Sequence, residues 1–189
     1  MYNFNTPKTL QECFERLKKG CETLRDECGY SNDYSQFNPP ATEEKIQDME
    51  KRLGFALPRE YREFLLFSNG AKIMGNSATI YGLDWIGATD PMVPAGYLTI
   101  GEVIGDGERI ALSEVDRKIY SFYGEEVSVW DFEREMVGLL KSCELDINDS
   151  RRENEKKARD FETIKRDAEE FDNFLERIRR SLEANKENK

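Results

Sequence analysis

The chain has 189 residues, a formal net charge of −10, 38% hydrophobic residues and no histidine, a length that fits one domain with helical extensions. The absence of histidine excludes the Ser-His-Asp triad, Cys-His dyads and every zinc site that needs an imidazole. Residues 1–150 carry 16 Lys/Arg against 27 Asp/Glu, so nucleic acid and anionic lipid are poor partners for this acidic body, and its charge either favours a basic protein partner or only keeps the chain soluble.

The first ten residues carry neither a basic start nor the apolar run of a secretory signal, and no later apolar run approaches the roughly 20 residues of a membrane span. We therefore expect a cytoplasmic protein with no membrane partner. In that reducing compartment the four cysteines are expected to be free thiols: Cys13, Cys21, Cys28 and Cys143.

A helix is predicted to begin at Thr6 and Pro7, because threonine can cap a helix and proline suits its first turn. The apolar residues of this helix recur at steps of four and three, at Leu10, Phe14, Leu17, Cys21, Leu24 and Cys28. Its cysteines lie seven or eight residues apart, too far along a helix to share one zinc ion, so we assign them to the core. Gly29 ends the helix, and residues 29–41 form a linker, so the N-terminal segment spans residues 1–39.

Two short helices are predicted next, joined near a proline. Thr42 caps the first helix and Gly54 ends it. Pro58 begins the second, and Asn69-Gly70 ends it because glycine readily takes the left-handed conformation found just past a helix. The apolar faces are Ile46, Met49 and Leu53 in the first helix, and Tyr61, Phe64, Leu65 and Phe67 in the second.

From about residue 72 to residue 123 the hydrophobic period changes to two, which predicts short strands at 77–83, 97–104, 108–115 and 118–123, with a further strand at 127–130. The breaks between these segments favour an antiparallel meander. Gly105-Asp106-Gly107 has the glycine density of a phosphate-binding loop, but it lacks the fingerprint spacing and a following helix, so we interpret it as a hairpin turn. Asp131 is then expected to cap a helix over residues 132–140.

The C-terminal segment, residues 146–189, is predicted to be a long charged helix, with Ser150 and Glu153 matching a capping box at its start. Apolar residues then follow heptad spacing, at Phe161, Ile164, Ala168, Phe171, Leu175, Ile178 and Leu182. This stripe predicts either docking along the N-terminal helix, which we favour, or a coiled-coil homodimer. The chain is therefore expected to be a monomer or a homodimer through the C-terminal helix.

No catalytic, cofactor-binding or metal-binding residue is predicted. Carboxylates are numerous, but no spacing singles out a pair for general acid and base catalysis, so we expect a protein that is not an enzyme. Trp85 and Trp130 each stand beside an aspartate. Either tryptophan is a candidate interface anchor, and core or rim packing is the alternative for both.

A distinctive pattern spans the two short helices: Ile46-x-x-x-Glu50-x-x-Leu53-Gly54-x-x-Leu57-Pro58-x-x-Tyr61-x-x-Phe64-Leu65-x-x-x-Asn69-Gly70. Alternating strands with a Gly-Asp-Gly-Glu turn follow it, and a Val-Trp-Asp lies near their end. Together these features resemble the SUKH superfamily, which joins fungal cell-wall regulators of the Smi/Knr type to bacterial toxin-immunity proteins. The resemblance covers about residues 40–140. It implies an α+β domain, residues 40–145, with two helices packed on a mostly antiparallel sheet, here with an extra N-terminal helix and the long C-terminal helix.

The resemblance also implies a cytoplasmic immunity protein that binds and blocks a cognate toxin, often a nuclease, from a polymorphic toxin system. The alternative is an intracellular scaffold or regulator of the cell-wall type that uses the same domain to bind several partners. No catalytic residue is carried over, because the motif positions are explained by helix packing and capping. Since nuclease toxins tend to present basic clefts, we expect an acidic contact surface that includes Asp84, Trp85, Asp90, Asp106, Glu108, Glu125 and Glu126.

Overall fold

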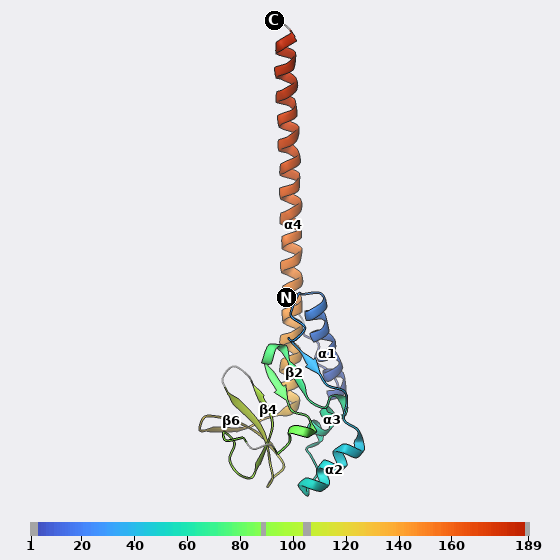
Figure 1. Cartoon of the computed structure of the whole chain (residues 1–189), viewed down its shortest axis with the longest axis vertical. Helices are drawn as coiled ribbons and strands as arrows, with labels where there is room; N and C mark the ends of the chain where they lie inside the picture. The colour runs from blue at the N-terminus through green and yellow to red at the C-terminus, as the bar shows by residue number, and fades with distance from the viewer. Residues whose placement is uncertain (1–3, 88–89, 104–106, 188–189) are drawn as a thin grey trace. The chain divides into compact units, whose positions relative to one another are not determined.

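The computed structural model describes residues 4–87, 90–103 and 107–187, and the chain divides into two units, Met1–Ile147 and Asn148–Lys189. The described helices are α1 (Leu10–Asp26), α2 (Glu43–Leu53), α3 (Arg59–Phe67) and α4 (Phe132–Glu187), with short 3-10 turns η1 (Met74–Asn76) and η2 (Leu83–Trp85). The described strands are β1 (Gln36–Phe37), β2 (Ala71–Ile73), β3 (Ala78–Ile80), β4 (Tyr97–Val103), β5 (Glu108–Ser113), β6 (Ile119–Tyr123) and β7 (Glu126–Val129). The predicted α+β class is confirmed (Figure 1).

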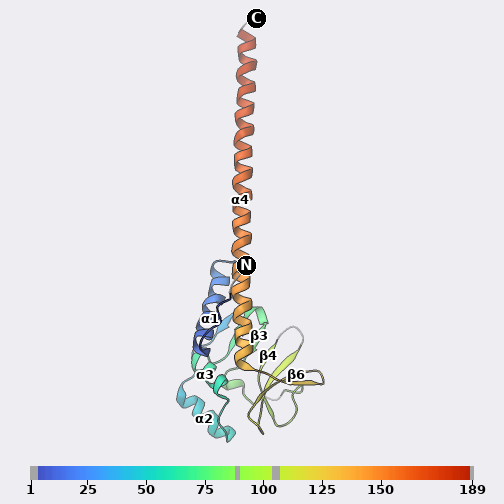
Figure 2. The same ribbon diagram turned by 180° about the vertical axis from the view of Figure 1, so that it is seen from behind.

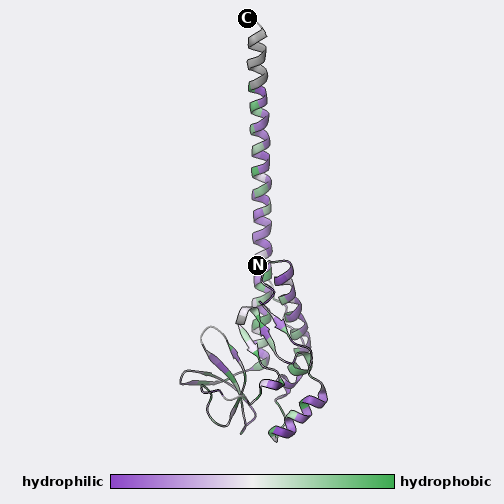
Figure 3. Cartoon of the chain, in the orientation of Figure 1, coloured by the Kyte–Doolittle hydropathy of each residue, from purple (hydrophilic) through white to green (hydrophobic). Residues whose placement is uncertain are grey.

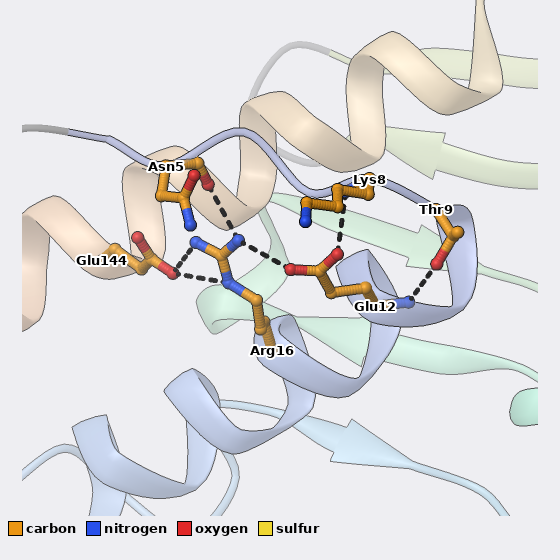
Figure 4. Close-up of polar contacts among 6 residues, drawn as sticks. All are labelled: Asn5, Lys8, Thr9, Glu12, Arg16 and Glu144. Atoms are coloured by element: carbon orange, nitrogen blue, oxygen red, sulfur yellow. Dashed lines mark hydrogen bonds and ion pairs between the residues drawn. The ribbon is translucent and has the colours of Figure 1, made fainter.

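Helix α1 begins three residues later than predicted, at a cap formed by Thr9. The Thr9 Oγ1 accepts the backbone N–H of Glu12 at 3.1 Å, and the Glu12 carboxylate accepts the N–H of Lys8 at 2.8 Å (Figure 4). The first bond satisfies an N–H group that a helix leaves unpaired at its start, and the second fixes the backbone just before the cap. The predicted helix start at Thr6 and Pro7 is therefore wrong. Thr9 has a glutamate, Glu12, three residues further along the chain, whereas Thr6 has no acidic residue at that distance.

The two helices of the motif are confirmed, with the second beginning at Arg59, one residue after Pro58. Thr42 caps α2 through the N–H of Lys45, and Gly54 ends it at φ 76°, in the left-handed region. Pro58 precedes the first turn of α3. Glu50, also part of the motif, accepts the N–H of Leu57 at 2.9 Å, so its side chain fixes the short connection between the two helices.

The seven strands form one sheet whose spatial order follows the chain, β1 to β7, and every neighbouring pair is antiparallel. The predicted meander is confirmed, and the pairing of Val103 with Glu108 confirms the hairpin that follows β4, although residues 104–106 lie outside the described residues. Strands β1 and β2 were not predicted. In both views β6 lies farther from α1 than β4 does (Figures 1 and 2).

An aromatic cluster joins three helices at the centre of the first unit. The ring of Phe14 on α1 meets Phe64 on α3 at 5.4 Å, edge to face, and both lie near Phe132 at the start of α4. Trp130 is 8% exposed, and its ring meets that of Phe132 edge to face, with the ring centres 5.3 Å apart. Of the two predicted roles of Trp130, packing in the core is therefore confirmed. Ring pairs of this kind add about 0.5–1.5 kcal/mol beyond their buried area.

The apolar face of α1 is covered within the first unit. A Cβ placed on Gly20 would lie 2.7 Å from the Cys143 Sγ of α4, so glycine permits a close approach of these two helices. Leu17 and Leu24 on the same face are fully buried. The predicted docking of the heptad stripe along this face is therefore wrong, because side chains of the first unit already occupy it.

An ion pair holds α1 and α4 together across 128 residues of sequence. The Arg16 guanidinium donates to the Glu144 carboxylate at 2.7 and 3.2 Å, and also to the carbonyl of Asn5 at 2.8 Å (Figure 4). Both partners are about three-quarters buried, with side chains 24% and 23% exposed. The paired charges therefore give the contact between the helices a fixed register.

Helix α4 is continuous from Phe132 to Glu187, so the predicted break between residues 140 and 150 and the capping box at Ser150 are wrong. No Gly or Pro occurs between residues 139 and 160 to end the helix. In the second unit, Phe161, Ile164, Phe171, Leu175 and Ile178 are 41–67% exposed. The Leu182 side chain lies outside the described residues.

All four cysteines are free, as predicted, and three are buried: Cys13, Cys21 and Cys143. Burial raises the pKa of the Cys13 thiol to about 11. The Cys143 thiol donates a hydrogen bond to the Cys21 sulfur, and this bond together with burial raises the pKa of Cys143, while the same bond lowers the pKa of Cys21. Because the thiolate is the nucleophile, the raised pKa values make Cys13 and Cys143 unreactive at neutral pH, whereas Cys21 is shielded by its burial, at 3% exposed.

We expect one fast-reacting thiol in the native protein. Cys28 is only partly buried, while Cys13, Cys21 and Cys143 are at most 3% exposed. Titration with Ellman's reagent should therefore modify about one cysteine rapidly in buffer and all four in denaturant. Cys28→Ser should remove the fast phase. Two or more fast thiols in the native wild-type protein would contradict this assignment.

Candidate functional site

The end of the sheet formed by β5, β6 and β7 carries a shallow acidic hollow. Ser121 pairs with Ser128 across β6 and β7, and Tyr123 pairs with Glu126. Because side chains alternate along a strand, these four side chains share one side of the sheet. They line a hollow of about 520 Å³ together with Glu108 and Val127.

The hollow presents hydrogen-bond acceptors in a small area. The Ser121 and Ser128 hydroxyls are hydrogen-bonded to each other at 3.0 Å, and Tyr123 is 50% exposed beside them. Glu108 and Glu126 add two carboxylates, and a carboxylate can accept two parallel N–H bonds from an arginine. The hollow is therefore suited to a cationic side chain with an apolar stem, such as arginine or lysine.

Strand β7 borders this hollow and forms an edge of the sheet. Within the described part of the chain its one hydrogen-bonded neighbour is β6, and all four of its residues are exposed. Val127 and Val129 are 53% and 62% exposed, and the acidic Glu126 is the one charged residue of the strand. An exposed edge of this kind can accept a further strand from a binding partner.

Glu125 lies in the tight turn between β6 and β7 and is exposed. Gly124, its neighbour in this turn, has φ 58°, a conformation that glycine accepts without strain. The turn thereby places Glu125 next to Glu126 at the end of the hairpin. We call Glu108, Tyr123, Glu125, Glu126 and strand β7 the acidic edge.

Trp85 lies elsewhere, in a second hollow of about 420 Å³. Its ring is 64% exposed and lies 6.3 Å from that of Tyr81, and the hollow is also lined by Lys72 and Thr79. Thr79 pairs with Glu102, Glu102 with Arg109, and Arg109 with Phe122, the neighbour of Ser121. Paired residues share one side of the sheet and neighbours along a strand lie on opposite sides, so this hollow lies on the other side of the sheet from Ser121. The structure therefore does not gather the predicted contact residues into one patch.

Asp90 is engaged inside the first unit. Its carboxylate accepts from the Arg109 guanidinium at 2.9 Å and from the N–H of Met92 at 2.9 Å. Arg109 also pairs with Glu102 at 3.3 Å, and burial followed by the Glu102 charge raises the pKa of the neighbouring Tyr81. Asp90 thus holds the loop before β4 against the sheet.

The remaining predicted residues divide as follows. Asp84 is exposed and lines a small hollow with Lys45, Asp48 and Arg52 of α2. Asp106 lies outside the described residues. Glu108, Glu125 and Glu126 come together at the acidic edge, whereas Tyr123 and the two serines beside them were missed. The alternation in Ile119-Tyr-Ser-Phe-Tyr123 and the two-residue turn after it were the signal that places them there.

No group of three or more His, Cys, Asp or Glu side chains is placed to hold a metal ion in the described ranges. None of the helices, as far as the structure describes them, has an apolar stretch long enough to cross a membrane.

The fold defines an α+β protein in which two short helices, joined at Leu57-Pro58, lead into a sequential antiparallel sheet. The model of the SMI1 / KNR4 family (SUKH-1) matches residues 40–177, and the chain belongs to this family. The match extends past residue 145, the predicted end of the domain. Among curated proteins, the uncharacterized protein YnaB of Bacillus subtilis (strain 168) is 37% identical over 67 residues, which are 34% of this chain and 46% of YnaB. The chain thus matches less than half the length of this relative.

Proposed function

We propose that this chain is a cytoplasmic, non-catalytic immunity protein that binds and neutralises a cognate polymorphic toxin through the acidic edge. The observation that carries this proposal is that Glu108 and Glu126 line one hollow beside an exposed edge strand. This surface offers charge for a cationic side chain and backbone groups for an added strand. A toxin domain with a basic surface, such as a nuclease, would fit both.

Family membership and net charge support the proposal. The SMI1 / KNR4 family (SUKH-1) belongs to the superfamily whose bacterial members include toxin-immunity proteins. Residues 1–150 carry 27 acidic against 16 basic side chains, so a positively charged partner is attracted over distances comparable with the Debye length. Steering of this kind raises the association rate, which an immunity protein needs because the toxin acts as soon as it is free.

The proposal predicts that the double variant Glu108→Lys/Glu126→Lys binds the toxin about tenfold to hundredfold more weakly than wild type. Both substitutions replace attraction by repulsion at the hollow. The partner to use is a toxin from an adjacent gene whose growth inhibition this chain relieves on co-expression, in a surface-binding assay at low and at physiological salt. The loss should be larger at low salt and should arise mainly in the association rate.

The matched control reverses the same charges on the exposed side of α1, in Glu15→Lys/Glu22→Lys, where both side chains point to solvent. This control should bind the toxin within a few-fold of wild type. Co-expression with the toxin should then show growth rescue by wild type and by the control, and weaker rescue by the Glu108/Glu126 variant. Equal affinity for all three proteins would reject the acidic edge as the contact surface.

A second function, that of a scaffold or regulator, is favoured by the exposed apolar stripe on α4, because an assembly protein needs more than one contact surface. The two functions differ in their partners. A large secreted-toxin gene immediately upstream, with rescue of growth on co-expression, supports immunity. An isolated gene, or failure to rescue with any adjacent toxin, supports the regulator.

A further inference from the structure

The second unit exposes a regular apolar stripe. Phe161 is 65% exposed, Ile164 67%, Phe171 59%, Leu175 47% and Ile178 41%, and Ala168 is also exposed. Apolar positions recur along this otherwise hydrophilic part of α4 (Figure 3). Large apolar side chains in this density on one helix face mark a surface that binds another protein.

The stripe has the spacing of a coiled-coil seam. Its residues alternate at steps of three and four, so in heptad notation Phe161, Ala168 and Leu175 occupy a positions, and Ile164, Phe171 and Ile178 occupy d positions. We call these six residues the seam. The seam spans about 26 Å of helix at 1.5 Å per residue.

The order of side-chain sizes along the seam identifies how two copies fit together. In a parallel pair each residue meets its own copy, so Ala168 would face Ala168 and leave a gap, while Phe171 would crowd Phe171. In an antiparallel pair with a positions against d positions, Ala168 faces Phe171. The remaining layers then join Phe161 to Ile178 and Ile164 to Leu175. The antiparallel fit therefore sets the one small side chain of the seam against a large one and leaves no layer with two alanines.

The charges beside the seam favour the same direction. In the antiparallel pair the e positions meet, which brings Lys165 of one helix next to Asp172 of the other, twice by symmetry. In the parallel pair the g positions of one helix meet the e positions of the other. Asp160 would then meet Lys165, but Asp167 would meet Asp172, and this like-charge contact would also occur twice. Only the antiparallel arrangement is free of a repulsive contact among these four residues.

We propose that a second copy of this chain binds the seam as an antiparallel helix, in a two-fold symmetric dimer. The symmetry axis passes between Ala168 and Phe171, so each copy contributes the same residues to the interface. The dimer buries the six side chains of the seam, which are exposed in the single chain. The seam lies in the second unit and shares no residue with the acidic edge.

The variant Asp172→Lys tests both the dimer and its direction. In the antiparallel pair the introduced lysine would lie against Lys165 of the other copy, so the substitution should weaken the dimer about tenfold, because two attractive contacts become repulsive. In a parallel pair the introduced lysine would lie against Asp167 and tighten the dimer. The measurement is sedimentation equilibrium of the full-length protein across the micromolar range, with circular dichroism to verify that helix content is unchanged.

Glu169→Lys is the matched control, since it makes the same charge change at a b position away from the seam. It should leave the dimer dissociation constant within about twofold of wild type. The double variant Lys165→Asp/Asp172→Lys should restore the wild-type constant. A wild-type monomer at every concentration would overturn the proposal, as would a tighter dimer for Asp172→Lys or no difference between Asp172→Lys and Glu169→Lys.

Discussion

Phe132→Ala is expected to lower the free energy of unfolding of the first unit by about 3–5 kcal/mol. Phe132 is 4% exposed, and its ring lies 5.3 Å from that of Trp130, 5.8 Å from Phe64 and 6.1 Å from Tyr61. Removing the ring leaves a cavity where the start of α4 meets α3. The neighbours belong to different elements and can close it only by moving those elements.

Urea unfolding followed by tryptophan fluorescence measures this effect, because Trp85 and Trp130 both lie in the first unit. The matched control is Phe161→Ala, which removes the same ring from a site that is 65% exposed in the second unit. At low protein concentration this control should change the free energy of unfolding of the first unit by less than about 0.5 kcal/mol. Similar losses for the two variants would show that the ring cluster is not the centre of the core.

Gly82→Ala is expected to destabilise the first unit by about 2–4 kcal/mol. A Cβ at this position would lie 2.4 Å from the backbone oxygen of Asn69. Asn69 cannot move aside easily, because its side-chain oxygen accepts the N–H of Leu83 at 2.8 Å and its carbonyl accepts from Asn38 at 3.0 Å. The added methyl group therefore pushes on a junction where three segments meet.

The control for Gly82→Ala is Gly138→Ala, because a Cβ at position 138 meets nothing within 4 Å and the residue lies inside α4. Alanine should stabilise the helix there by about 1 kcal/mol. Thermal unfolding measures the opposite signs of the two shifts. A melting temperature for Gly82→Ala equal to that of wild type would contradict this prediction, because it would show that the backbone at Asn69 moves aside without loss of stability.

The helices that local signals define were predictable from the sequence. The caps at Thr42 and Gly54 and the stop at Asn69-Gly70 depend on backbone conformations and hydrogen bonds that each residue makes with its near neighbours. The heptad and alternating patterns likewise report which face is apolar, and this is set by a few neighbouring residues. These elements agree with the structure for that reason.

The errors arise where distant residues decide. Strand β1 has two residues in a Gly- and Pro-rich segment, and it exists because Gln36 and Phe37 pair with Lys72 and Ala71 of β2. No local pattern reports such a pairing. At Ser150 the opposite occurs: a local cap motif is present, but the helix continues through it because every residue around it tolerates a helix.

The composition of the candidate site was predictable, but its geometry was not. Acidic residues in turns are visible in the sequence. Glu108 and Glu126 line one hollow, and Glu125 precedes Glu126 in the turn. Which side of the sheet a residue occupies depends on strand register, so Trp85 could not be separated from them by sequence alone. Likewise, the long-range partner of Asp90, Arg109, becomes visible only in the folded structure.

The ion pair between Arg16 and Glu144 has a consequence for the order of folding. Strands β2 to β7 pair only with neighbours in the chain, so their contacts close short loops and can form while synthesis proceeds. The contact between α1 and α4 closes a loop of 128 residues, and it has to wait until residue 144 has left the ribosome. A nascent chain that stops before α4 therefore keeps part of the α1 face uncovered, and this interval is when the protein is most exposed to aggregation and proteolysis.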